Sequence, residues 1–170
     1  MINQADGFDR EAVLARVEAL IARHGQAVIS VLGVEAVGGG SADLSYTVGL
    51  SRAGLPELCI SGVGEPSLHR SLLNLAADEA RGGRVPQDGG TSRRVVRGLP
   101  VGFVALDAAL ATRELRVAAA MTGRTVQALQ MLLPDPAGLL PWEPGCDPDY
   151  AAEQSRLFGH DLSRLRPRYQ

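Results

Sequence analysis

The chain has 170 residues, of which 45% are hydrophobic and 21% are charged, and its formal net charge is −2. This length suits one compact domain with a core of its own and is too short for two ordinary domains. The slightly acidic balance gives no overall attraction to nucleic acid or to an anionic membrane surface, so we expect neither as a partner.

All 17 basic residues are arginine, so the chain contains no lysine. Without lysine it can form neither a Schiff-base nucleophile nor an internal aldimine with pyridoxal phosphate. A phosphate-binding loop of the GxxxxGK[ST] type is excluded for the same reason.

The cysteines and histidines are scattered along the chain. Cys59 and Cys146 show no CxxC spacing, which argues against a zinc knuckle or a redox motif. His24, His69 and His160 show neither HxH nor HExxH spacing, so we expect no metal. The amino terminus lacks the regions of a secretory signal, and no apolar run approaches the ~20 residues of a membrane-spanning helix. We therefore expect a cytoplasmic protein with reduced thiols.

The first part of the chain predicts one helix and a three-stranded meander. Apolar residues at 3- and 4-residue spacing predict a helix over residues 9–24. Strands are predicted at 26–37, 44–50 and 57–62, and their short connections favour antiparallel pairing. Gly33 is expected to form a bulge in the first of these strands.

The second part predicts a longer helix, further strands and a proline-rich loop. Pro66 suits the first position of a helix over residues 66–81. The run 125–133 is short and apolar and fits either a strand or a helix, but its β-branched start and the stop at Pro134 favour a strand. The other expected elements are a loop at 82–92, short strands at 93–97 and 101–106, helix within 107–120 and a structured loop at 134–150.

These elements predict a single α+β domain over residues 1–170, with a core at about 9–159 and a basic tail at 160–170. A mostly antiparallel sheet would pack against the two main helices, both on one side of the sheet. The proline-rich loop, which carries the only tryptophan, Trp142, would lie across one end of the sheet.

Two motifs that lie far apart in the sequence resemble a known family. The residues that carry this resemblance are Tyr46–Leu50, Gly54–Leu58, Ala128–Gln130, Pro134-Asp135, Gly138 and Pro141-Trp142. Together they are similar to the bacterial family catalogued as domain of unknown function 4262, over nearly the whole chain. Members commonly end in Gln-Pro-x-Leu-Gly, whereas Gln154–Gly159 keeps the glutamine and the glycine but lacks the proline. The family is uncharacterised, so the resemblance implies no activity.

The first functional hypothesis is a small-molecule-binding enzyme that uses acid–base and hydrogen-bond chemistry without a metal or redox cofactor, for example in specialised metabolism. Its pocket would lie between the strand that carries Tyr46, the start of the helix that carries His69 and the loop that carries Trp142. His69 would be the acid or base, because an imidazole titrates near neutral pH. Tyr46 and Gln130 would donate hydrogen bonds, and Trp142 would stack on the ligand. The alternatives are a structural histidine and a core tyrosine.

Ser61 and Asp135 complete the predicted ligand-binding residues. Ser61 ends a strand and precedes Gly62-Val63-Gly64, an order that suits either an anion site at a helix amino terminus or a plain turn. Asp135 lies among carboxylates near Trp142. Such oxygen ligands suit a divalent cation, but aspartates beside prolines also form turns. We assign no metal there, because the spacing does not fit the twelve-residue calcium loop.

The second hypothesis is a non-catalytic interaction or regulatory module that acts through an arginine-rich surface loop. Its arginines are Arg81, Arg84, Arg93, Arg94 and Arg97. They could bind an acidic small molecule or partner, or could simply be solvated. Nucleic acid is disfavoured, because aromatic residues make up only 4% of the chain and none lies between these arginines. The oligomeric state stays open, with a homodimer as one option.

Overall fold

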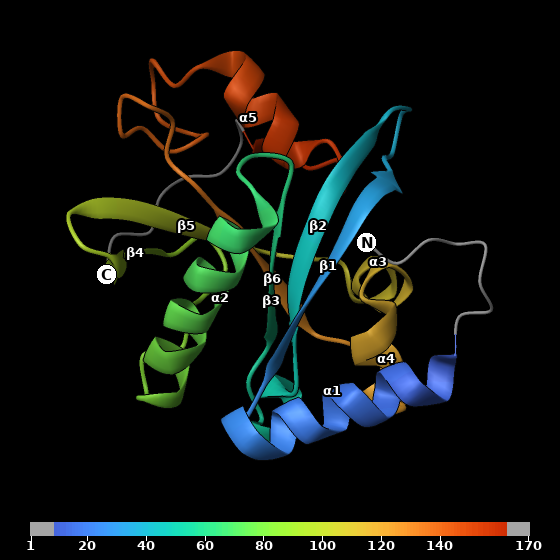
Figure 1. Cartoon of the computed structure of the whole chain (residues 1–170). Helices are drawn as coiled ribbons and strands as arrows, with labels where there is room; N and C mark the ends of the chain where they lie inside the picture. Colours follow the sequence, from blue (N-terminus) through green and yellow to red (C-terminus); the bar gives the residue numbers. More distant parts are fainter. Residues whose placement is uncertain (1–8, 163–170) are drawn as a thin grey trace.

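The computed structural model describes residues 9–162, so the predicted basic tail lies for the most part outside the described residues (Figure 1). The elements, in chain order, are α1 (Arg10–His24), β1 (Ala27–Glu35), β2 (Ser41–Val48), the 3-10 helix η1 (Leu50–Ala53), β3 (Glu57–Ser61), α2 (Pro66–Arg81), β4 (Thr91–Val96), β5 (Leu99–Ala105), α3 (Ala108–Glu114), α4 (Arg116–Thr122), β6 (Ala128–Leu132) and α5 (Pro148–Ser155).

The six strands form one sheet in the order β1-β2-β3-β6-β5-β4. Every neighbouring pair is antiparallel except β3 and β6, which are parallel. This confirms the predicted α+β fold with a mostly antiparallel sheet and its β1-β2-β3 meander. The bulge expected at Gly33 is also present, because the β1–β2 register shifts between Val31 and Val34.

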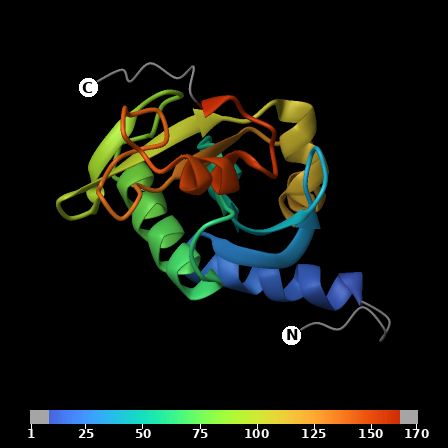
Figure 2. The same cartoon turned by 90° about the horizontal axis from the view of Figure 1, so that it is seen from above.

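Apolar side chains cover both faces of the sheet. Along β3, Leu58 and Ile60 join the apolar cluster that contains α2, whereas Cys59 joins the cluster that contains α3, α4 and residues Val17 and Ile21 of α1. Seen from above, α2 lies on one side of the sheet, and α3 and α4 lie on the other (Figure 2). The expectation that both main helices cover one side is therefore wrong. A strand with apolar residues at successive positions is buried on both faces and needs a helical layer on each.

The helix α5 begins at the end of the predicted loop at 134–150 and continues through residues 151–155, for which the sequence predicts no regular element. Asp147 caps it by accepting hydrogen bonds from the N–H groups of Asp149 (2.9 Å) and Tyr150 (3.4 Å). Pro148 occupies the first turn, where a missing N–H costs nothing. The prolines of this region indicated loop throughout, but this one begins a helix.

A close contact fixes α5 to the end of β3. A Cβ atom added at Gly62 would lie 2.1 Å from the carbonyl oxygen of Glu153. Only glycine allows the two backbones to approach in this way. Within residues 9–162, no helix is both long and apolar enough to cross a membrane.

Candidate functional site

The first sequence motif builds a buried hydrogen-bond network around Glu57. Its carboxylate accepts from the Thr47 hydroxyl (2.6 Å) and from the N–H groups of Gly49 (2.9 Å) and Ser51 (3.1 Å). The Thr47 oxygen in turn accepts from the N–H of Leu58 (2.8 Å). Glu57 is fully buried, so the motif joins β2, η1 and β3 from inside. We had not singled out Glu57, although a carboxylate at the start of an apolar strand is a recognisable signal.

His69 is fully buried in α2, and both its ring nitrogens have partners. Nε2 lies 2.6 Å from the carbonyl oxygen of Val63, which can only accept, so Nε2 carries a proton and donates it. Nδ1 lies 3.1 Å from the Ser45 hydroxyl, which itself contacts the Ser30 hydroxyl at 2.9 Å. These contacts tie the start of α2 to β2 and β1.

Tyr46 is also buried, with its side chain pointing toward α4. Its hydroxyl oxygen accepts a hydrogen bond from the N–H of Val117 (3.2 Å), in the first turn of that helix. Burial raises the pKa of Tyr46 to about 12, so its phenol stays protonated at neutral pH. Here the tyrosine caps a helix from within the core.

Gln130 and Ser61 are both fully buried. The Gln130 amide nitrogen donates to the backbone oxygen of Gln154 (2.5 Å). The Gln154 side chain pairs with both polar groups of the Leu133 backbone, at 2.7 Å for the N–H and 2.9 Å for the carbonyl. The Ser61 hydroxyl and the side-chain oxygen Oε1 of Gln130 make no hydrogen bond to any residue in the range 9–162. Gln154 thus fastens α5 to the residue that follows β6.

Asp135 organises the proline-rich loop. Its carboxylate accepts from the N–H groups of Ala137 (3.0 Å), Leu139 (2.9 Å) and Asp147 (2.9 Å). These bonds hold the pKa of Asp135 below its usual range, and the bond from the N–H of Asp147 has the largest effect. The described residues contain no group of three or more His, Cys, Asp or Glu side chains that could hold a metal ion.

The lowered pKa of Asp135 has a consequence for stability at acid pH. Since the unfolded chain has the ordinary value of about 4, the carboxylate stabilises the fold above that pH, and this contribution is lost as the pH falls below it. We expect Asp135→Asn to be less stable than the parent at neutral pH and to lose less further stability between about pH 5 and pH 3. Urea unfolding across that range measures this, and equal pH slopes for the two proteins would refute it.

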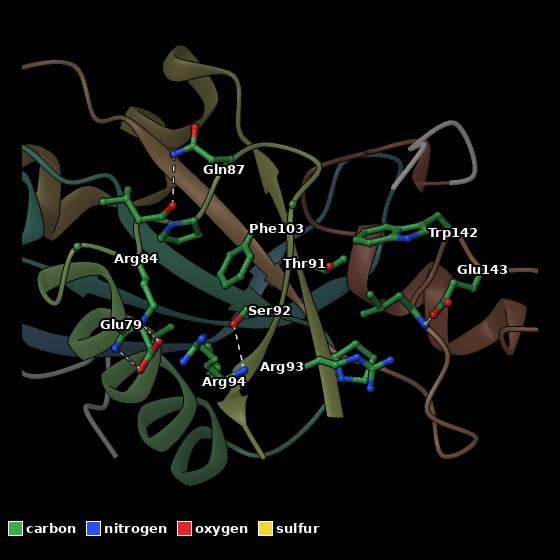
Figure 3. A pocket seen from close by; sticks show the side chains of 18 residues that line it. Glu79, Arg84, Gln87, Thr91, Ser92, Arg93, Arg94, Phe103, Trp142 and Glu143 are labelled. Carbon is green, nitrogen blue, oxygen red and sulfur yellow. Dashed lines mark hydrogen bonds and ion pairs between the residues drawn. The ribbon is translucent and has the colours of Figure 1, made fainter. Parts of the chain in front are cut away.

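A cavity of about 600 Å³ surrounds the edge strand β4 and is here called the β4 cavity. It is bounded by the end of α2, the loop 82–90, β4, β5 and the Trp142 loop (Figure 3). Its charged and hydroxyl-bearing side chains are Glu79, Arg84, Thr91, Ser92, Arg93, Arg94 and Glu143.

Side chains of β4 alternate between two sides of the cavity. Arg94 points to one side, where Glu79 and Arg84 lie, and Arg93 points to the other, toward Trp142 (Figure 3). Arg84 is already engaged, because its Nε and Nη2 atoms lie 2.5 and 3.0 Å from the two carboxylate oxygens of Glu79.

Two guanidinium groups of the cavity remain largely available. Arg93 has one long contact to the carbonyl of Gly98, at 3.4 Å, and is exposed. The Arg94 side chain is exposed and makes no hydrogen bond within residues 9–162. The nearby Glu143 carboxylate accepts from the N–H of Leu140 (2.7 Å), which holds it in its own loop.

Trp142 forms a partly exposed wall of the cavity. A Cβ atom added at Gly102 of β5 would lie 2.0 Å from the indole Cη2 atom, so the ring occupies the space of a missing side chain. The indole also packs against the apolar cluster of Val104, Leu132 and Leu162. These contacts hold the ring in one place while one part of it stays accessible.

The structure therefore does not bring all the predicted site residues to the β4 cavity. Trp142 lines the β4 cavity, whereas Tyr46, His69, Ser61, Gln130 and Asp135 do not. The β4 cavity therefore lies elsewhere than the pocket expected between Tyr46, His69 and Trp142. Arginines from the second hypothesis line it instead, together with residues that we had not selected, namely Glu79, Thr91, Ser92 and Phe103.

The sequence model of one family, described as Domain of unknown function (DUF4262), matches residues 20–147 of the 170-residue chain. The chain belongs to the DUF4262 family. The match takes in both sequence motifs, the Glu57 network and every wall of the β4 cavity, and it ends just before α5. No curated protein and no solved structure matches the chain.

Proposed function

We propose that this DUF4262 protein binds an organic anion in the β4 cavity, with the apolar part of the ligand against Trp142. The observation that carries the proposal is the meeting of two features that are separate in the sequence. The arginines of the loop and β4 line the same cavity as the tryptophan of the second motif. A concave site with an apolar wall and a few polar groups is the usual form of a ligand site.

Charge supports an anionic ligand. The cavity is lined by three arginines and two glutamates, but Glu79 is paired with Arg84, and Glu143 accepts a backbone hydrogen bond. Arg93 and Arg94 are left with free hydrogen-bond donors. Guanidinium groups bind carboxylates and phosphates through two parallel hydrogen bonds.

The proposal concerns binding and names no reaction. His69 and Tyr46, the expected proton-transfer groups, are buried and lie outside the cavity. Each is occupied by contacts within the fold. Catalysis through these two residues would need a different arrangement of α2 and β2.

Benzoate and benzamide test the proposal, because they have the same shape and differ in charge. We expect benzoate to shift the indole N–H resonance of Trp142, the only tryptophan of the chain, and benzamide to bind several-fold more weakly. In the double variant Arg93→Gln/Arg94→Gln, benzoate should bind about tenfold more weakly.

The matched control is Arg70→Gln/Arg113→Gln. Both arginines are exposed and neither lines the cavity, so this variant makes the same change in net charge elsewhere. Its affinity for benzoate should stay within about twofold of the parent. Equal binding of benzoate and benzamide, or equal losses in the two double variants, would sink the proposal.

A further inference from the structure

We propose that the ligand of the β4 cavity is an extended acidic peptide that joins the sheet as a further strand beside β4. This inference rests on the proposed anion site and deepens it. The cavity surrounds the last strand of the sheet and has walls on both faces of that strand. A small anion needs one wall, whereas an added strand presents side chains to both.

The outer edge of β4 has backbone groups free to pair. The backbone N–H of Phe103 donates to the carbonyl of Gly90 (3.0 Å), and the carbonyl of Phe103 accepts from the N–H of Gly89 (2.8 Å). The backbone polar groups of Phe103 in β5 therefore point toward the segment that leads into β4. Because hydrogen-bonded and non-hydrogen-bonded pairs alternate along antiparallel strands, the backbone polar groups of Val101 and of its partner Ser92 then point toward each other. The N–H and carbonyl of Thr91 and the N–H of Arg93 consequently point away from β5, and within residues 9–162 these three groups bond to no residue outside the sheet.

The side chains beside this edge define what an added strand would carry. Arg94 and Ser92 lie on one side of β4, and Arg93 and Trp142 lie on the other (Figure 3). Neighbouring residues of an extended peptide point to opposite faces. An acidic residue would meet Arg94, and the next residue, apolar or aromatic, would meet Trp142.

Charge also decides against a second copy of this chain at the same edge. Pairing β4 with another β4 would bring Arg93 and Arg94 close to the same two residues of the other copy. Like charges opposite one another destabilise a strand pair. Adjacent edge arginines oppose such self-association and favour a partner of opposite charge.

The test uses a heptapeptide of alternating valine and glutamate, with an acetylated amino terminus and an amidated carboxyl terminus. We expect it to bind the full chain and to slow amide exchange of Thr91 and Arg93 by about tenfold or more. Replacing the glutamates by lysines should abolish binding. Two further peptides carry N-methyl groups on all valine amides or on all glutamate amides. One of these two should bind about tenfold more weakly than the parent, because only one edge of the peptide pairs with β4.

The other possible results would overturn strand addition alone or the anion site as well. Equal binding by both N-methylated peptides, or unchanged exchange at Thr91 and Arg93, would overturn strand addition. So would protection of these amides that grows with protein concentration in the absence of peptide, which would indicate a second copy. If glutarate or benzoate binds as tightly as the peptide, the anion site stands and the peptide inference fails. If neither the peptide nor benzoate binds, both fail.

Discussion

Glu57→Ala should lower the free energy of unfolding by about 3 kcal/mol. The substitution removes the carboxylate that accepts from two backbone N–H groups, those of Gly49 and Ser51, which the surrounding fold holds in place. It also leaves the Thr47 hydroxyl without its acceptor. Each buried polar group left without a partner costs about 1–3 kcal/mol, and removal of the side chain adds a void. Urea unfolding at neutral pH measures the effect.

Two controls separate this network from a general effect of losing a glutamate. Glu57→Gln keeps one acceptor oxygen in nearly the same volume, so its cost should be about 1 kcal/mol. Glu79→Ala removes an exposed ion pair with Arg84 and should cost less than about 1 kcal/mol. A Glu57→Ala protein no less stable than Glu79→Ala would show that the network does not stabilise the fold.

Gly62→Ala should be nearly as damaging, because it places a methyl group against backbone atoms. The added Cβ would lie 2.1 Å from the Glu153 oxygen and 2.6 Å from its carbonyl carbon. The φ angle of +89° at Gly62 adds the cost of a left-handed conformation. Since α5 must move to relieve the contact, we expect a loss of about 3 kcal/mol in the free energy of unfolding.

Gly83→Ala is the matched control for this substitution. Gly83 has nearly the same φ, +91°, but no atom within 4 Å of the added Cβ, so its variant should show the conformational cost alone, about 1 kcal/mol. A local measurement tests the cause. Movement of α5 should speed amide exchange at Leu133, whose N–H bonds to Gln154. Equal stability of the two variants would contradict the close contact between Gly62 and α5.

Local sequence signals predicted most elements of this fold. The helix α2 has the predicted bounds, because Pro66 marks its start and its apolar stripe is regular. The strand at Ala128–Leu132 was predicted from a run that also fitted a helix. The parallel pairing of β3 with β6 was not predicted, since it joins segments far apart in the chain. The helix α5 was missed because Pro148 and the prolines before it indicated a loop.

The candidate site was less predictable, for a physical reason. Tyr46, His69 and Gln130 are residue types that serve catalysis and also serve buried hydrogen bonding, and their sequence neighbours do not distinguish the two uses. Their partners, Val117, Val63 and Gln154, become apparent only in the folded chain. The β4 cavity likewise forms where the end of α2, the strand β4 and the Trp142 loop meet.

Mapping the benzoate-induced changes in the amide and indole resonances of the full chain tests the proposed site most directly. Binding in the β4 cavity predicts that the shifts concentrate on the Trp142 indole and on the amides of the lining residues 84, 85, 87 and 90–95. Shifts concentrated instead around Tyr46, His69, Ser61 and Gln130 would contradict it and would return the site to the place that the sequence first indicated.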